Sequence, residues 1–183
     1  IADSFVGNDG NGRDAGPSDP GDWVAANECY LNSPQRNSTW HGTHVSGTIG
    51  AATNNASNIA GINWVSKILP VRVLGKCGGY TSDIMDAMTW SAGLSVPGVP
   101  SNPNPAKVVN LSLGGGGACD AVFEQPIINN VIAAGTTVVI AAGNSNGDAA
   151  NFSPGNCNGV ITVAATQRAG ARASYSNYGT TVE

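Results

Sequence analysis

Hydrophobic residues in the second half of the chain gather in short, almost uninterrupted runs, with longer and more polar stretches between them. The runs at Lys107 to Leu113, Thr137 to Ala142 and Val160 to Ala165 predict strands, and Val122 to Ala134 predicts a helix. Strands that are apolar throughout are typical of parallel sheets with helices on both faces. The pattern therefore predicts a three-layer αβα fold of the α/β class, with a mostly parallel sheet as the middle layer.

The periodic segments of the first half are shorter. His41 to Ala51 has two apolar residues four positions apart among small neighbours, which predicts a tightly packed helix. Lys67 to Leu74 is predicted to be a strand, and Ser82 or Asp83 is predicted to cap a helix that reaches Ala92. Functional residues of such folds gather where strands end, so the glycine-rich turns after the predicted strands are candidate sites.

Composition narrows the class of protein. The chain has 183 residues, of which 41% are hydrophobic and 11% charged, so it can bury the core of one globular domain. A net charge of -4 and a pI near 4.9 disfavour a nucleic-acid partner. No apolar run approaches the roughly 20 residues that cross a membrane, and we expect any targeting or pro-segment to lie upstream of Ile1.

The four cysteines are widely separated and form no C-x-x-C pair, which disfavours a zinc or thioredoxin-like site. Each lies in a turn-like setting, typical of disulfides in exported proteins. Three pairings are open, and we favour Cys29 with Cys77 and Cys119 with Cys157. The alternative is four buried, unpaired thiols.

Both histidines fall in HGTHVSG, at the start of the predicted helix. A general base needs access to a cleft and a pKa near the working pH, and His41 at a helix entrance beside a glycine meets the first need. His44, one turn inward, is expected to face the core. Two ordinary polar residues are the alternative, and a zinc site lacks the Glu of H-E-x-x-H.

A second candidate is Asn144, which follows an apolar strand that ends in Ala-Ala-Gly. Its amide N–H is suited to donate to a developing oxyanion, a contribution of about 3 kcal/mol where such donors have been removed. An asparagine that merely closes a turn is the alternative.

Five segments together resemble the subtilisin family of serine proteases. They occur in the family's order: HGTHVSGTIGA from His41, VRVLGKCGG from Val71, VVNLSLGG from Val108, VVIAAGN from Val138 and NFSPGN from Asn151. The similarity covers nearly all of the chain from Trp40 onward and is greatest to the disulfide-containing secreted bacterial branch. It implies the three-layer subtilisin-like fold, and it identifies His41 as the triad base and Asn144 as the oxyanion donor.

The resemblance also implies a substrate site. Ser112, Leu113 and Gly114 would pair with one side of an extended peptide and Cys77, Gly78 and Gly79 with the other. One wall of the primary specificity pocket would consist of Ala141, Ala142 and Gly143, and the far wall of Phe152 and Gly155. Small walls leave a roomy apolar pocket, which predicts broad cleavage after large hydrophobic residues.

Two parts of the family pattern are missing. The motif Gly-Thr-Ser-Met-Ala, which carries the nucleophile, does not occur, so the chain alone is expected to be unable to form an acyl-enzyme. Asp3 lacks the preceding strand and following glycine of the triad aspartate, which is expected upstream of Ile1. Residues 1–183 are thus interpreted as a single, partial catalytic domain whose partners are an extended polypeptide and the rest of that domain.

An oxygen-rich loop near the start of the chain is a candidate calcium site. Its candidate ligands are Asp9, Asn11, Asp14 and Asp22. The loop lacks the terminal Glu and the helices of an EF-hand, and a solvated acidic loop is the alternative.

The function predicted from these observations is secreted serine endopeptidase. One rival is a catalytically inactive homologue that serves as a binding module, because the serine motif is absent. The other is a nucleotide-binding domain built on LSLGGGG, but that run has neither a P-loop lysine nor a G-x-G-x-x-G motif.

Overall fold

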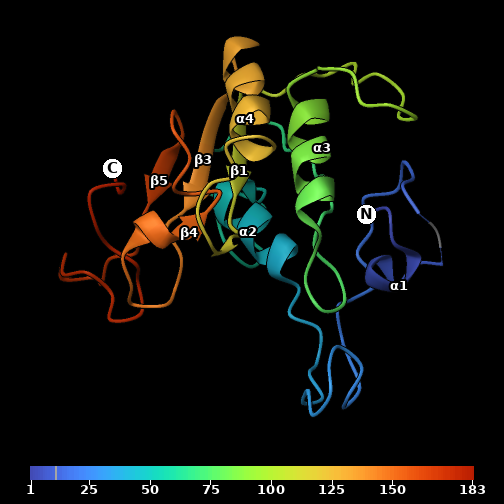
Figure 1. The fold of residues 1–183 in the computed structure, drawn as a ribbon, viewed down its shortest axis with the longest axis horizontal. Helices are drawn as coiled ribbons and strands as arrows, with labels where there is room; N and C mark the ends of the chain where they lie inside the picture. Colours follow the sequence, from blue (N-terminus) through green and yellow to red (C-terminus); the bar gives the residue numbers. More distant parts are fainter. Residues whose placement is uncertain (11) are drawn as a thin grey trace. The chain divides into compact units, whose positions relative to one another are not determined.

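The computed structural model describes residues 1–10 and 12–183, which divide into two units, Ile1–Ala87 and Met88–Glu183. Helix α3 (Thr81–Ser91) runs from the first unit into the second (Figure 1). No helix in the described part of the chain is long and apolar enough to cross a membrane.

A three-stranded parallel sheet forms the centre of the second unit. Its strands are β1 (Val108–Leu111), β3 (Thr137–Ala141) and β5 (Ile161–Val163), in the spatial order β1-β3-β5. Val138 and Ile140 on the central strand are each 1% exposed. The three predicted strands are therefore confirmed, each slightly shorter than its apolar run.

Helix α4 (Glu124–Ala133) connects β1 to β3 and packs against β3. Ile128 and Val131, three positions apart on one helix face, are fully buried. The helix ends before Gly135, whose φ of +87° is easily adopted only by glycine. The predicted helix and the α/β class with a mostly parallel sheet are confirmed.

Two short segments that follow β1 and β3 in the chain form a separate, two-stranded antiparallel sheet. Strand β2 (Gly115–Gly116) pairs with β4 (Phe152–Ser153), and the short 3-10 helix η1 (Ala149–Asn151) directly precedes β4. The glycine-rich turn after β1 is thus held by hydrogen bonds to a segment 37 positions later, since Gly116 is opposite Phe152 and Gly115 opposite Ser153.

The first unit contains helices and loops. Its helices are α1 (Ser4–Gly7), α2 (His41–Gly50) and the start of α3. Helix α2 confirms the helix predicted from His41. Helix α1 lies in a stretch for which the sequence predicted no helix. Asp3 caps it by accepting hydrogen bonds from the N–H groups of Phe5 and Val6, and a single turn is too short to show a hydrophobic period.

Both favoured disulfides are confirmed. Cys29 is bonded to Cys77 in the first unit and Cys119 to Cys157 in the second, with Cα–Cα distances of 5.4 and 5.1 Å. No described cysteine is free.

The strand predicted at Lys67 to Leu74 is wrong. These residues form no strand, and Ile68, Leu69 and Val71 are between 37% and 39% exposed. A strand exists only where its backbone pairs with a neighbour, and no described segment pairs with residues 67–74. The apolar pattern is present in the sequence, but its partner is not among the described residues.

Two side-chain predictions also need correction. The capped helix begins at Thr81, so Ser82 and Asp83 lie in its first turn; the Asp83 carboxylate instead accepts hydrogen bonds from the N–H of Ala2 and from Arg13. His44 is exposed rather than turned to the core, because α2 buries none of its residues within the first unit and no described strand packs on it there.

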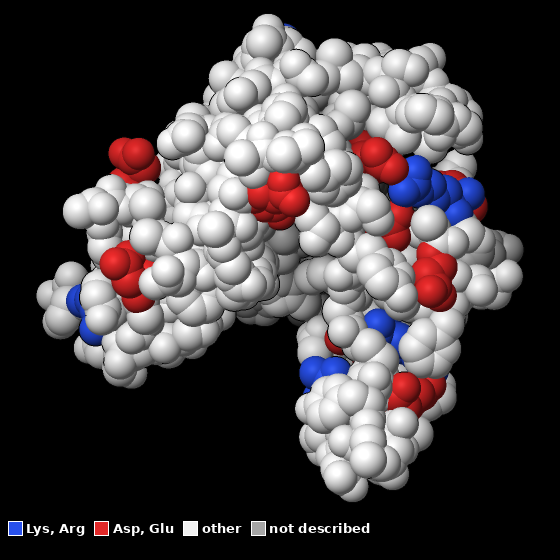
Figure 2. Space-filling view, in the orientation of Figure 1, with Lys and Arg blue, Asp and Glu red and all other residues white. Residues whose placement is uncertain are grey.

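Three cations of the first unit are paired with carboxylates. Arg13 binds Asp83 and Asp86, Arg72 binds Asp9 and Asp19, and Lys76 binds Glu28. On the face drawn in Figure 2, charged groups are sparse and several blue groups adjoin red ones. That face shows no continuous basic surface.

Candidate active site

His41 is the first residue of α2 and is exposed to solvent. Just before it, Trp40 has a left-handed φ of 51°, and Thr39 is held by Asp22. The Asp22 carboxylate accepts hydrogen bonds from the N–H (2.6 Å) and the hydroxyl (2.9 Å) of Thr39. The imidazole itself makes no hydrogen bond to any described residue, so it is available to a partner outside them.

The environment of Asp22 affects its ionisation. Partial burial by itself raises the pKa of this carboxyl, but the two hydrogen bonds from Thr39, the N–H of Asp22 itself and the charge of Arg36 together leave the pKa below its ordinary value. Asp22 is therefore ionised near neutral pH and anchors the segment that enters α2.

The candidate substrate segment at Cys77, Gly78 and Gly79 overlaps a tight turn between Gly75 and Gly78. The N–H of Gly75 donates to the carbonyl of Gly78 at 2.8 Å, and Gly78 has a φ of +114°. A Cβ on Gly79 would lie 2.2 Å from the carbonyl oxygen of Val73. The geometry of the turn by itself therefore accounts for glycine at both positions.

A buried lysine supports this turn. The ammonium of Lys76 donates to Glu28 at 2.7 Å and lies 4.0 Å from the centre of the Trp23 ring. Its hydrogen bond lowers the pKa of Glu28 below the ordinary value. Because the neighbouring Cys77 is bonded to Cys29, the turn is attached to residues 28–29 by both an ion pair and a disulfide.

In the second unit, two of the predicted substrate segments leave adjacent strands at one edge. Leu111 is opposite Ile140 in the parallel register of β1 and β3. The segments that follow, Ser112 to Gly114 and Ala141 to Gly143, therefore start side by side at the carboxyl edge of the sheet. Ala142 is 1% exposed, whereas Gly114 is open to solvent.

The predicted far wall of the pocket reaches the same place. Phe152 is paired with Gly116, and a Cβ on Gly143 would lie 3.7 Å from the Phe152 ring. Gly155 is buried, and a Cβ there would lie 3.0 Å from the carbonyl oxygen of Ala141. The structure thus brings the predicted walls of the second unit together.

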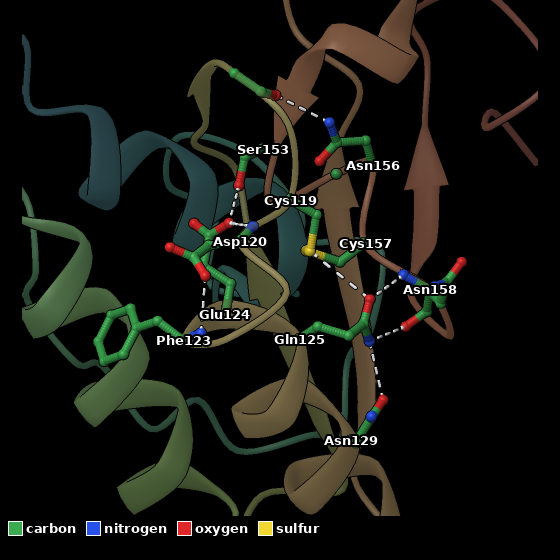
Figure 3. Close-up of a disulfide and its surroundings, with 12 residues drawn as sticks. Cys119, Asp120, Phe123, Glu124, Gln125, Asn129, Ser153, Asn156, Cys157 and Asn158 are labelled. Carbon is green, nitrogen blue, oxygen red and sulfur yellow. Dashed lines mark hydrogen bonds between the residues drawn. A yellow bond between two sulfur atoms is a disulfide. The ribbon is translucent and has the colours of Figure 1, made fainter.

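The disulfide of Cys119 and Cys157 lies near Glu124 and Ser153 in the second unit (Figure 3). The buried Glu124 at the start of α4 accepts hydrogen bonds from the Ser153 hydroxyl and from the Asp120 N–H. It therefore connects α4 to β4. Cys119, Glu124 and Cys157 are also the one group of three potential metal ligands found among the described residues, but the two sulfurs are bonded to each other and offer no thiolate.

Asn144 lies in the turn after β3 and is exposed. Its carboxamide makes no hydrogen bond to a described residue, so its donors are unused. Gly143, just before it, has a φ of +105°. The turn therefore presents an unengaged amide at the same sheet edge as the candidate pocket walls.

One residue of this site was missed by the sequence analysis. Asn177 is fully buried, and its N–H and side chain form their hydrogen bonds with residues 142–147. It lies in ASYSNYG, a polar stretch with no hydrophobic period, so no sequence pattern marks it as buried.

The model of the subtilase family matches residues 13–183. This chain belongs to the subtilase family. The fold and the predicted resemblance are thereby confirmed for the chain.

Two similar proteins are named as extracellular proteases. This subtilase chain is 54% identical over 183 residues to an extracellular protease of Xanthomonas campestris, covering 100% of the chain and 31% of the relative. It is 52% identical over 178 residues to an extracellular basic protease of Dichelobacter nodosus, covering 95% of the chain and 29% of the relative. The chain thus spans about a third of the length of these relatives.

Solved structures agree with the family assignment. A protease structure from Pseudoalteromonas arctica matches with a TM-score of 0.97 and 55% identity, over 100% of this chain and 53% of that one. A cold-adapted subtilisin-like serine proteinase matches with a TM-score of 0.56 and 36% identity, over 78% of this chain and 46% of that one. The subtilase fold is therefore shown by structure as well as by sequence.

In the structure, the aspartates of the acidic loop form an ion pair and hydrogen bonds with other residues of the chain. Asp9 binds Arg72 at 3.3 Å, Asp14 accepts from the N–H of Gly16, and Asp22 holds Thr39. Asn11 lies outside the described residues. No three carboxylates converge among the residues described, so the calcium site stays a prediction.

Proposed function

We propose that the protease to which this chain belongs hydrolyses peptide bonds through an acyl-enzyme. His41 takes the proton of the nucleophilic serine as that oxygen attacks the scissile carbonyl, and then gives a proton to the leaving amine. The amide of Asn144 and a backbone N–H stabilise the negative oxygen of the tetrahedral intermediate. Water then repeats the attack and releases the acyl group.

The observation that carries this proposal is that the side chain of Asn144 is exposed and makes no hydrogen bond to a described residue. Its carboxamide stands at the carboxyl edge beside Ala142 and Gly143. An oxyanion donor must be held in place by its backbone while its own N–H groups remain free. In a subtilase chain, that arrangement supports an oxyanion role over that of a turn-closing asparagine.

The rest of the triad is proposed to come from parts of the protease that residues 1–183 do not span. The serine motif does not occur in the chain, which covers 31% of its Xanthomonas relative. The first unit also exposes apolar side chains, with Ile62 at 84% and Val65 at 91%. An exposed apolar surface of this kind is usually covered by another segment, and the remainder of the catalytic domain is proposed to cover it.

An extended polypeptide is the proposed substrate. Ser112 to Gly114 and Cys77 to Gly79 would each pair with its backbone, and the small residues Ala142 and Gly143 would form one wall of a pocket for the side chain before the scissile bond. The expected preference is broad, with large hydrophobic side chains favoured. A fluorogenic peptide panel in which charged residues were cleaved fastest would contradict it.

The test uses the whole protease. A fluorophosphonate probe should label the wild-type enzyme at its serine, and His41→Ala should lower kcat by about 10⁴-fold or more. His44→Ala is the matched control, because His44 is exposed on the same helix and has no proposed role. An unlabelled wild type would instead support the inactive binding homologue, and equal activity of the two histidine variants would contradict the role of His41.

The protease is further proposed to be secreted and to bind a structural calcium ion. The two disulfides and the extracellular relatives support secretion. The oxygen-rich loop with Asp9, Asn11, Asp14 and Asp22 supports calcium binding by its composition. Calcium should raise the Tm of the wild-type protease but not of Asp14→Ala, and an equal rise in both would contradict the site.

A further inference from the structure

The N–H and the side chain of Asn177 make their hydrogen bonds with the turn that carries Asn144. Its main-chain N–H donates to the Gly143 carbonyl at 2.9 Å, and its Nδ2 donates to the Ala142 carbonyl at 2.8 Å. Its Oδ1 accepts from the N–H of Ser145 at 2.8 Å and from that of Gly147 at 3.1 Å. Gly143 and Ser145 are the two neighbours of Asn144, so the backbone is held on both sides of it.

The fit between the turn and Asn177 is close. Asn177 is 0% exposed, and a Cβ on Gly143 would lie 2.4 Å from its Nδ2. Any side chain at position 143 would therefore push the asparagine out of place. Without Asn177, the Ala142 carbonyl and the Ser145 and Gly147 N–H groups would lose the hydrogen bonds that define the turn.

Asn177 is itself attached to the sheet. The hydroxyl of Ser176 donates to the Asn177 carbonyl at 3.0 Å and accepts from the N–H of Ala165 at 2.9 Å. Ala165 follows β5, the strand that pairs with β3. A continuous series of hydrogen bonds thus leads from the parallel sheet through Ser176 and Asn177 to the neighbours of Asn144.

We propose that Asn177 is a positioning residue for the oxyanion donor. It does not reach the reacting atoms; it fixes the backbone on both sides of Asn144, so that the free carboxamide points to where the oxyanion forms. This proposal rests on the role proposed above for Asn144. Orientation of this kind affects the transition state more than substrate binding, because the oxyanion exists only after attack.

The first test separates kcat from KM in the whole protease. Asn177→Ala should lower kcat by about 10- to 100-fold, the loss that small misplacements in an active site produce, and change KM by less than about 2-fold. Asn177→Asp keeps the acceptor for Ser145 and Gly147 and should recover part of kcat. A loss confined to KM would overturn the proposal.

Asn102→Ala is the matched control for loss of a buried asparagine. Asn102 is 7% exposed, lies in the same unit, donates to the carbonyls of Trp90 and Ser91 and accepts from an N–H. Its replacement should lower the Tm as Asn177→Ala does, with kcat unchanged. An equal fall of kcat in both variants would show a general effect of destabilisation and would overturn the positioning role.

A double-mutant cycle with Asn144→Ala tests whether Asn177 affects kcat through Asn144. If Asn177 acts through Asn144, Asn177→Ala should change kcat by less than about 2-fold in the Asn144→Ala background. The same 10- to 100-fold loss in both backgrounds would overturn the positioning role alone. A normal kcat for Asn144→Ala by itself would overturn the oxyanion assignment, and the positioning role with it.

Discussion

The guanidinium Nη2 of Arg13 lies 2.8 Å from the carboxylate Oδ1 of Asp83, although 70 residues separate the two along the chain. The same carboxylate accepts a hydrogen bond from the N–H of Ala2 at 2.9 Å, and its side chain is 3% exposed. Asp83 thus attaches the start of the chain to the first turn of α3.

Asp83→Asn should destabilise the whole protease by about 1–3 kcal/mol, because the N–H of Ala2 and the guanidinium of Arg13 lose a buried, charged acceptor. Asp86→Asn is the matched control: Asp86 binds the same guanidinium but its side chain is 39% exposed, so the cost should stay below about 1 kcal/mol. Urea denaturation measures both. Equal costs would contradict the importance of burial at Asp83.

The pH dependence follows from the ionisation of Asp83. Burial by itself raises its pKa, but the hydrogen bonds from Ala2 and Arg13, together with the positive charges of the N-terminus and Arg13, leave the pKa below the ordinary value of 3.8. The unfolded chain therefore binds the proton more readily. The contribution of Asp83 to stability should be complete above pH 3.8 and disappear as the pH falls through its lower folded pKa, so that Asp83→Asn flattens the acid limb of a stability–pH profile.

Gly78 and Gly79 should respond differently to alanine. Gly78→Ala meets no atom within 4 Å but must keep a φ of +114°, which costs about 1–2 kcal/mol. Gly79→Ala would place a methyl 2.2 Å from the Val73 carbonyl oxygen, so the backbone must move and the cost should be larger. Tm and KM for a long peptide measure both effects. A milder effect at Gly79 than at Gly78 would be the contrary result.

Removing either disulfide should cost a similar amount. The bridges join residues 48 and 38 positions apart, and the chain-entropy model gives about 4 kcal/mol for each, because the cost varies only with the logarithm of loop length. Paired serine replacements, Cys29→Ser with Cys77→Ser and Cys119→Ser with Cys157→Ser, should lower the guanidinium midpoint comparably. An unchanged midpoint for either pair would refute the entropic account for that bridge.

Glu124 should matter for the pocket wall as well as for stability. Glu124→Leu leaves the Ser153 hydroxyl and the Asp120 N–H without their acceptor, which should cost about 1–3 kcal/mol and raise KM for peptides with large hydrophobic residues, as β4 and Phe152 loosen. Glu124→Gln retains a carbonyl acceptor and serves as the control. Indistinguishable KM values for the two variants would argue against any influence of Glu124 on the pocket.

Much of the architecture was predictable from local patterns. The runs that became β1, β3 and β5 and the helices that begin at His41 and near Val122 follow from apolar periodicity, which depends only on residues close in sequence. The disulfide pairing and the family were also predicted correctly. The strand expected at residues 67–74 was not formed, because strand formation needs a paired neighbour that apolar residues alone do not supply.

The sequence by itself determined the family, the parallel α/β class and the candidate residues His41 and Asn144, since these rest on short motifs and local periods. Only the tertiary structure decided how Asn144 is held. Asn177 lies 33 positions away in a polar stretch, and its burial against residues 142–147 arises from strand pairing and long-range hydrogen bonds. Such contacts depend on where the whole unit brings distant residues together, which no local pattern of side chains encodes.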